Sequence, residues 1–208
     1  SPLWNGDGTV LITGGLGGLG IVTAEALVEL GATSIVLASR SGKIKYDGQG
    51  LQERLEALRA SGVTIVIEQC DTADEQQVIE LLERVRCGGY SPLRGVVHAA
   101  GVLSDAMLRS QNEESIRRVV EPKAMGAWYL HKHTTDDALD IFMTYSSVAS
   151  LFGNVGQANY SAANAFLDEL VRWRVSQGLC GVSVQWPAVS GVGMAASMDE
   201  RVAISDSM

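Results

Sequence analysis

Short apolar runs alternate with longer amphipathic segments along this chain, which is the pattern expected of alternating strands and helices. We expect strands at residues 10–12, 35–38, 63–67, 95–98, 141–144 and 182–185. Apolar residues recur at helical spacing between these runs, and we expect helices at residues 21–30, 51–61, 74–85, 112–131 and 157–177. The run at residues 63–67 is interpreted as a buried strand. Pro122 is expected to disturb the fourth helical segment, because proline lacks a backbone donor.

Six strands separated by helices specify a single α/β domain with a parallel sheet covered on both faces. Right-handed crossovers then predict the doubly wound, Rossmann-like strand order 3-2-1-4-5-6. In such sheets, ligands bind beyond the carboxyl ends of the strands. The polar residues that follow the expected strands are therefore the first candidates for a functional site.

Five glycines lie within seven residues directly after the first expected strand, from Gly14 to Gly20. Gly15, Gly17 and Gly20 fit the pattern G-x-G-x-x-G. In that pattern the first glycine permits a tight turn, the second lets a phosphate approach the backbone, and the third lets the helix pack closely on its strand. The strand before these glycines and the helix after them favour a dinucleotide site at the helix N-terminus over a glycine-rich turn without a ligand.

The residues after the second and third strands indicate which nucleotide is bound. An acidic residue after the second strand would bind the ribose hydroxyl of NAD, but this chain has Ser39 and Arg40 there. A guanidinium beside a hydroxyl suits the 2′-phosphate of NADP, and the alternative is a surface arginine. Asp71 is placed either to accept a hydrogen bond from the adenine amino group or to cap the next helix.

Composition narrows the possible partners and compartments. The chain has 208 residues and a formal net charge of −8, which disfavours nucleic acids and anionic membrane surfaces as partners. Its three cysteines show no metal-ligand spacing, so no metal site is expected, and their sparse, odd number indicates a reducing, cytoplasmic compartment. No apolar run approaches the roughly 18 residues of a membrane helix, and no signal peptide is visible. Both ends look cut, so we expect a piece of a longer polypeptide.

A serine and a tyrosine follow one another at the end of the fifth expected strand and on the next expected helix. Tyr160 and Asn164 lie four residues apart on an expected helix and so share one face, while Ser147 ends the fifth strand. Hydride reduction of a ketone leaves negative charge on the oxygen, which the hydroxyls of Ser147 and Tyr160 can stabilise. A free phenol titrates near 10, so Tyr160 needs a nearby cation to release its proton readily. The alternatives are a turn role for Ser147 and a core role for Tyr160.

Several longer motifs carry a family resemblance: TGGLGGLG (13–20), HAAGVL (98–103), EPKAMGAW (121–128), YSS (145–147), GQANYSAAN (156–164) and WP (186–187). With them the chain resembles the short-chain dehydrogenase/reductase family, and more narrowly the ketoreductase domain of polyketide synthases. Most members have a lysine four residues after the tyrosine, where this chain has Asn164. Polyketide ketoreductases are similar to this chain in having the positions of the lysine and the asparagine exchanged. Lys123 matches the lysine of that arrangement. Without the resemblance, Lys123 would be interpreted as a solvated side chain.

The resemblance implies that Lys123 assists Tyr160 and holds the nicotinamide ribose, and that Asn164 positions Lys123 or a water chain. It also implies NADPH as the cofactor. Besides Tyr160 and Lys123, the residues expected to bind NADPH are Thr13, Gly14, Gly15, Leu16, Gly17, Gly18, Leu19, Ser39, Arg40, Asp71, Thr72, Ala99, Ala100, Gly101 and Pro187.

The resemblance further implies a β-ketoacyl thioester on an acyl carrier protein as substrate, and the other domains of a synthase as partners. A Leu-Asp-Asp signature marks family members that make the D-alcohol, and this chain keeps its last residue as Asp105. Family members that make the opposite alcohol have a tryptophan where this chain has Phe152. The resemblance therefore implies the D-alcohol. A helix cap is the alternative for Asp105. The other residues expected near the substrate are Gln157, Trp186 and Met194.

Arg109, Arg117 and Arg118 are a conceivable basic patch for the acidic carrier protein, although such residues more often form a solvated helix face. The segment around Met194 falls where the family closes over substrate, and we expect the lid and a last strand to be incomplete. Two other functions stay open at this point. One is a stand-alone short-chain reductase acting on a free small ketone, and the other is a non-catalytic NADP-binding scaffold domain.

Overall fold

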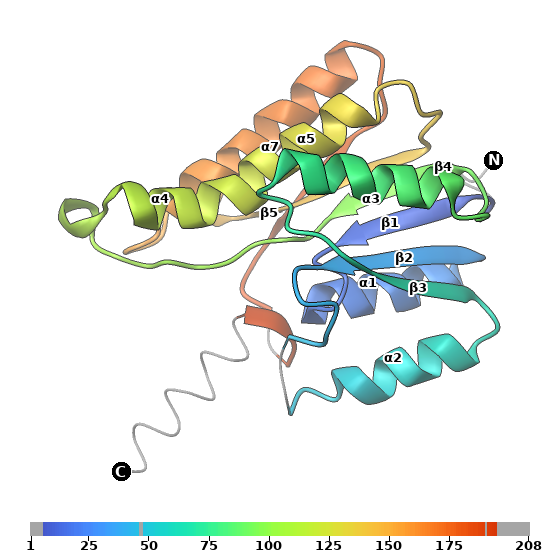
Figure 1. The fold of residues 1–208 in the computed structure, drawn as a ribbon. Helices are drawn as coiled ribbons and strands as arrows, with labels where there is room; N and C mark the ends of the chain where they lie inside the picture. The colour runs from blue at the N-terminus through green and yellow to red at the C-terminus, as the bar shows by residue number, and fades with distance from the viewer. Residues whose placement is uncertain (1–5, 46–47, 190, 195–208) are drawn as a thin grey trace.

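A six-stranded parallel sheet forms the centre of the protein, with helices packed on both of its faces (Figure 1). The computed structural model describes residues 6–45, 48–189 and 191–194. The strand order is β3-β2-β1-β4-β5-β6, which confirms the doubly wound order predicted from the sequence. The strands are β1 (Thr9–Thr13), β2 (Ser34–Ser39), β3 (Thr64–Gln69), β4 (Leu93–His98), β5 (Ile141–Ser147) and β6 (Val182–Trp186).

The helices fall close to the expected segments. Asp74 caps α3 through its side chain, which accepts from the backbone of Gln76 and Gln77, and Asn112 caps α4 in a capping box. The helices are α1 (Gly18–Glu29), α2 (Leu51–Ala60), α3 (Glu75–Cys87), α4 (Glu113–Val120), α5 (Gly126–His133), α6 (Ala149–Phe152) and α7 (Ala158–Ser176), with a 3₁₀ turn η1 (Leu108–Ser110) and a π-helical turn η2 (Glu121–Met125).

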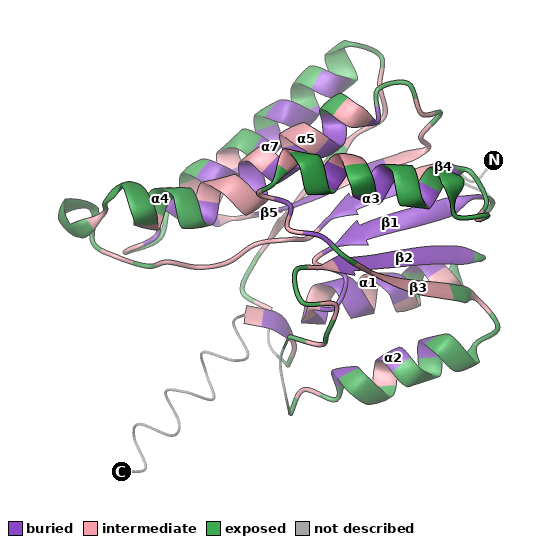
Figure 2. Ribbon diagram, viewed as in Figure 1, coloured by how far each residue is buried: buried purple, intermediate pink, exposed green. Residues whose placement is uncertain are grey.

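The two faces of the sheet bury separate apolar clusters, because successive side chains on a strand point to opposite faces. Val10 and Ile12 of β1 belong to the cluster beneath α1 and α2, whereas Leu11 belongs to the cluster beneath α3 and α5. Figure 2 shows the result as buried central strands and helices that are exposed on their outer sides. All five residues of β1 are buried, so this strand is packed on both faces and fixes where the turn after it begins.

Two expectations about the elements need correction. Residues 64–69 form the edge strand β3 and are only half-buried at best, because an edge strand has one neighbour. Helix α1 begins at Gly18, inside the glycine run. Pro122 disturbs the fourth helical segment as expected, because the α-helical pattern gives way to the π-helical turn η2 at this residue before α5 begins. Helix α6 and turn η1 were not expected, and residues 195–208, where the lid was expected, lie outside the described residues.

Candidate active site

The glycine run forms the turn between β1 and α1, and its residues have different steric roles. Gly14 adopts a φ of +68°, so the tight turn requires this glycine, and the assignment of that role to Gly15 was wrong. A Cβ on Gly15 would lie 2.9 Å from Leu37 Cα, so Gly15 is needed for packing against β2. A Cβ on Gly20 would lie 2.6 Å from Gly15 Cα, so this third glycine lets the helix pack closely on the turn, where packing on the strand was expected.

Gly17 is the residue that leaves backbone open at the helix start. It is the N-cap of α1, and no side chain caps the helix there. A Cβ on Gly17 would lie 3.3 Å from Gly14 O, and among the described residues no other heavy atom beyond its chain neighbours comes within 4 Å of it. The uncapped N–H groups at this end of α1 therefore favour an anion, as a helix N-terminus does.

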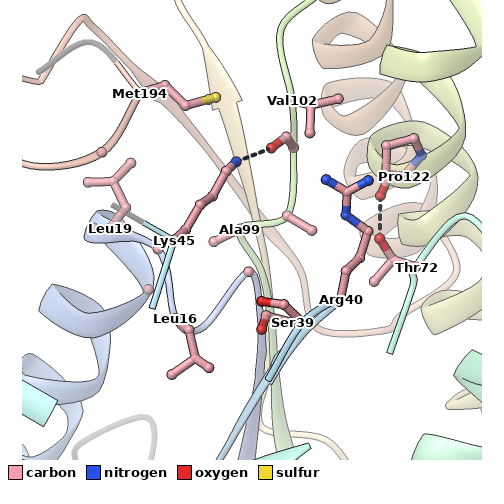
Figure 3. Close-up of a pocket in the computed structure, with 18 of the residues that line it drawn as sticks. Leu16, Leu19, Ser39, Arg40, Lys45, Thr72, Ala99, Val102, Pro122 and Met194 are labelled. Carbon is pink, nitrogen blue, oxygen red and sulfur yellow. Dashed lines mark hydrogen bonds between the residues drawn. The ribbon is translucent and has the colours of Figure 1, made fainter. Parts of the chain in front are cut away.

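A groove of about 440 Å³ runs from this turn across the carboxyl ends of β1, β2 and β4 (Figure 3). This volume lies within the range of small-molecule sites. Of the residues expected at the cofactor, the groove is lined by Gly14, Leu16, Gly17, Gly18, Leu19, Ser39, Arg40, Asp71, Thr72, Ala99, Ala100 and Gly101. It is also lined by Met194, expected near the substrate, and by Gly20, Ser41, Lys43, Lys45, Cys70, Val102, Pro122 and Gly193.

Some residues expected at the cofactor do not line this groove. The Thr13 side chain is fully buried and lies 2.7 Å from His98 Nδ1, and Gly15 donates its N–H to Ala38 O. Both residues therefore shape the turn from beneath it. Pro187 is exposed and is likewise not among the lining residues, nor are the buried Lys123 and the half-buried Tyr160.

Cationic side chains flank the groove beyond β2. Arg40 is exposed and points across the groove, and Ser39 Oγ accepts a hydrogen bond from Gly42 N at 3.1 Å. Lys45 donates its backbone N–H to Leu16 O and its Nζ to Gly101 O at 3.3 Å, so it reaches from the glycine turn to the end of β4 (Figure 3). Burial and the charge of Arg40 lower the pKa of Lys45. Sequence analysis missed Lys45, because it lies in a polar loop with no periodic pattern.

Asp71 faces the groove from the loop after β3. Its side chain accepts a hydrogen bond from Ala73 N at 3.1 Å, and its backbone N–H donates to Gln77 Oε1. The helix-capping alternative for Asp71 was wrong, because Asp74 performs that role. Asp71 thus stabilises its own loop, and it is one of the residues that line the groove.

Lys123 is buried rather than solvated. Its Nζ donates to Tyr145 O at 2.9 Å and lies 5.3 Å from the centroid of the Tyr160 ring. A Cβ on Gly101 would lie 3.4 Å from Lys123 Nζ, so the ammonium sits directly behind the groove wall. Burial lowers the pKa of Lys123 from 10.5 to about 8, and the carboxylate of Asp168 opposes this shift. The interpretation of Lys123 as a surface lysine is therefore wrong.

Ser147, Tyr160 and Asn164 converge around this lysine. Burial raises the pKa of Tyr160, and hydrogen bonding by the side chains of Asn164 and Ser147 opposes the shift. Ser147 Oγ also accepts from Ala149 N at 3.1 Å, so Ser147 stabilises the turn after β5 as well. Asn164 Nδ2 donates to Tyr160 O at 2.8 Å, while its Oδ1 is buried with no hydrogen-bond partner among the described residues.

Two of the residues expected near the substrate contact each other. Gln157 Nε2 donates to Asp105 Oδ2 at 3.0 Å, which joins the loop after β4 to the start of α7. Asn159 Nδ2 reinforces the junction by donating to Ser104 O. Asp105 caps neither η1, whose N-cap is Met107, nor α4, so the capping alternative was wrong.

The other two residues in this region behave differently. Phe152 is 84% exposed at the end of α6. Trp186 packs its ring against Tyr145, with ring centroids 5.4 Å apart, and it contacts the apolar cluster beneath α1. Its indole therefore supports the core at this point, and it does not line the groove.

The exposed face of α4 carries charges of both signs. Arg117 pairs with Glu113 and Glu121 at 2.9 and 3.2 Å, and these glutamates lie beside Arg118. Within the basic patch considered for this face, the charge of Arg117 is thus neutralised by the two glutamates. No cluster of three histidine, cysteine or acidic side chains suited to a metal occurs in the described part of the chain. None of the described helices combines the length and apolar character needed to cross a membrane.

Comparison with known proteins places these features in a family. The model of the KR domain matches residues 8–191. A mycocerosic acid synthase-like polyketide synthase of Mycobacterium tuberculosis is 42% identical over 199 residues, which are 96% of this chain and 9% of that protein. A chalcone synthase, cfoA, of Aspergillus candidus is 44% identical over 91% of this chain and 7% of its own length. The chain thus spans less than a tenth of the length of either relative.

Solved structures agree with this result. A-type ketoreductases from a modular polyketide synthase match with a TM-score of 0.84 and 37% identity, over 96% of this chain and 42% of theirs. The ketoreductase from the first module of phoslactomycin biosynthesis in Streptomyces sp. HK803 matches with a TM-score of 0.85 and 39% identity, over 97% of this chain and 46% of its own. The chain therefore belongs to the ketoreductase domains of polyketide synthases, oxidoreductases of the short-chain dehydrogenase/reductase superfamily that bind a nicotinamide cofactor.

Proposed function

We propose that this chain uses NADPH to reduce the β-keto group of an acyl thioester held on an acyl carrier protein, giving the D-β-hydroxyacyl thioester. It would act as one catalytic domain of a multifunctional synthase. The observation that carries the proposal is the buried ammonium of Lys123, 5.3 Å from the Tyr160 ring and directly behind the groove wall at Gly101. A desolvated cation beside a phenol is an arrangement suited to proton transfer.

The groove fits a phosphorylated dinucleotide. The uncapped start of α1 at Gly17 offers N–H groups and the positive end of the helix dipole to a pyrophosphate. Arg40 and Ser39 lie after β2, where the ribose of the adenosine half is expected, and a guanidinium there favours a 2′-phosphate. These features support NADPH over NADH. A non-catalytic NADP-binding scaffold domain would have the same features, so only a measurement of turnover distinguishes it from a reductase.

In the proposed reaction, NADPH bound along the groove would provide the hydride that the carbonyl carbon of the substrate receives. Tyr160 donates its phenolic proton to the carbonyl oxygen, so the ketone becomes a hydroxyl and the tyrosine is left as a phenolate. Ser147 donates a hydrogen bond to the same oxygen while its negative charge develops. The ammonium of Lys123 stabilises the phenolate and so makes the proton easier to release.

Tyr160 must regain a proton before the next turnover. The buried Oδ1 of Asn164 has no hydrogen-bond partner among the described residues, and an unpaired buried acceptor is a natural position for a bound water. We assign Asn164 the role of holding such a water beside Tyr160 and Lys123. Lys123 would then pass the proton from this water to the phenolate.

The large synthases among the relatives support a thioester substrate on a carrier protein. The D-configuration rests on Asp105 and on its hydrogen bond with Gln157, which ties the loop after β4 to the start of α7 beside Tyr160. Asp105 bonds the residue three positions before Tyr160 in the chain, so its carboxylate lies at the end of α7 that carries the proposed proton donor. A polar wall at this point would restrict the face from which the β-keto group enters.

NADPH oxidation in the presence of a β-ketoacyl thioester surrogate, followed at 340 nm, tests the proposal. We expect Tyr160→Phe to lower kcat by at least about 100-fold, as general acids contribute this much or more, with NADPH binding retained. Tyr129→Phe is a control, because it removes a hydroxyl from a tyrosine packed in another cluster. Unchanged turnover in Tyr160→Phe would refute the mechanism, and NADPH binding without any oxidation by the wild type would favour a scaffold domain.

A further inference from the structure

The helical segment that carries Lys123 changes its hydrogen-bond pattern at that residue. Between α4 and α5, η2 is a single π-helical turn in which Gly126 donates its N–H to Glu121 O, five residues earlier. Pro122 lies at the start of this turn and has no backbone donor. Single π-turns inside α-helices are locally unfavourable and often occur at functional sites. The question is what holds this turn in place.

Two consecutive carbonyls of the turn accept hydrogen bonds from the carboxyl edge of the sheet. Thr72 Oγ1, in the loop after β3, donates to Pro122 O at 2.8 Å (Figure 3). His98 Nε2, at the end of β4, lies 2.8 Å from Lys123 O. Both contacts involve backbone atoms of the turn, so they fix the path of the chain at Lys123.

The bonding of His98 determines its tautomer. A carbonyl oxygen can only accept, so Nε2 must carry a proton and donate to Lys123 O. Nδ1 is then the acceptor for the hydroxyl of Thr13, which lies 2.7 Å away. Complete burial and the nearby charge of Lys123 lower the pKa of His98 to about 3, so the ring is neutral and does not titrate near neutral pH. His98 therefore links β1 to the turn as a fixed pair of hydrogen bonds.

Gly126 allows this close approach. A Cβ at this position would lie 2.9 Å from Thr72 Cβ and 3.1 Å from His98 Cε1. The glycine is thus required because the helix at residue 126 touches the two side chains that hold the turn. Thr72 and His98 therefore bind the turn to the sheet edge, and Gly126 leaves room for this contact.

We propose that His98 is a positioning residue for the reduction, which acts by holding the backbone of Lys123 so that its ammonium lies beside the Tyr160 ring. The inference rests on the proposed function, because it assigns the role of Lys123 in that same site. His98 itself touches neither substrate nor cofactor, since it is fully buried behind the turn.

The surroundings of Lys123 make its position measurable. The charged or titratable groups around it are His98 of β4, Tyr160 and Asp168 of α7, and, through the backbone only, Tyr145 of β5. If the turn loosens, water reaches the ammonium and the pKa of Lys123 rises from about 8 towards 10.5. The alkaline limb of the kcat/KM profile for ketone reduction then moves to higher pH, because Lys123 stays protonated up to a higher pH.

The experiment compares His98→Ala, which removes both hydrogen bonds, with His98→Gln, whose amide can donate to Lys123 O and accept from Thr13. His131→Gln is the matched control, since His131 is also a buried histidine but bonds Arg174. Thr13→Val serves if His98→Ala does not fold, because it removes only the hydroxyl that donates to His98 Nδ1 and so frees the ring on one side. Each variant is measured for kcat/KM against pH, and the Lys123 ¹³Cε resonance is titrated by NMR in the labelled protein.

We expect His98→Ala to lose on the order of 100-fold in kcat/KM, as a misplaced catalytic group can cost this much, with both the limb and the NMR midpoint shifted to higher pH. His98→Gln recovers most of the loss, and His131→Gln shifts neither midpoint. An unshifted Lys123 midpoint in His98→Ala, or in Thr13→Val if that variant replaces it, overturns the inference. The NMR titration needs no turnover, so a wild type without reductase activity would refute the proposed function separately.

Discussion

Replacing the buried lysine of this site should raise stability while removing activity. Lys123 is 3% exposed and carries a charge that the unfolded chain solvates freely. Lys123→Met keeps the length and volume of the side chain but removes that charge. We therefore expect the variant to be more stable than the wild type at neutral pH and to have lost most of its reductase activity.

The size of the effect follows from the pKa of Lys123, which falls from 10.5 in water to about 8 in the folded protein. At 1.36 kcal/mol for each pKa unit, this difference corresponds to about 3 kcal/mol of stability lost when the buried amine is protonated. Methionine cannot donate to Tyr145 O, and leaving that carbonyl without its donor costs about 1 kcal/mol. The expected net gain at pH 7 is about 2 kcal/mol.

The gain should depend on pH in a defined direction. Below pH 8 the amine is protonated in both states, so the wild type carries the full burial penalty. Between pH 8 and 10.5 the unfolded chain holds a proton that the folded chain has released, so the wild type gains stability as pH rises. The advantage of Lys123→Met therefore shrinks through this range and is lost above it.

Urea unfolding followed by tryptophan fluorescence and circular dichroism, at several values from pH 7 to 10, measures these free energies of unfolding. Lys132→Met is the control, because Lys132 is an exposed lysine of α5 that pairs with Glu75. This variant should change stability by less than about 1 kcal/mol, with no trend between pH 8 and 10. A Lys123→Met protein that is less stable than the wild type at pH 7, by an amount that does not change with pH, would refute the reasoning.

Two further predictions concern the cofactor and the product. Arg40→Ala should raise the KM for NADPH at least about tenfold and leave the KM for NADH nearly unchanged, because a charge-assisted hydrogen bond is worth about 1.5 kcal/mol or more; equal effects on both cofactors would contradict the 2′-phosphate assignment. Asp105→Ala removes the partner of Gln157 and should lower the excess of the D-alcohol, measured by chiral chromatography of the product. An unchanged product ratio would remove Asp105 from stereocontrol.

Local patterns in the sequence were sufficient for the fold. Strand and helix periodicities differ, so the alternation of the two could be read directly, and right-handed crossovers then leave one strand order. Two helices were expected to begin at residues 74 and 112, and Asp74 and Asn112 cap them there, whereas the capping alternatives for Asp71 and Asp105 failed. The glycine run was recognisable for the same reason, although the assignment of the turn to Gly15 failed because the conformation of Gly14 depends on contacts with the β4 end.

The environment of each site residue came only from tertiary structure. Nothing near Lys123 in the sequence indicates burial, because the groups that surround it come from β4, β5 and α7. Lys45 looked like an ordinary loop residue until folding placed it across the groove from the glycine turn. Periodicity and spacing report contacts between residues close along the chain, whereas desolvation and charge at a site depend on residues far apart. For this protein the sequence by itself therefore determined the sheet and the glycine turn after β1, and the tertiary structure decided how Lys123, the proposed catalytic lysine, is buried and held.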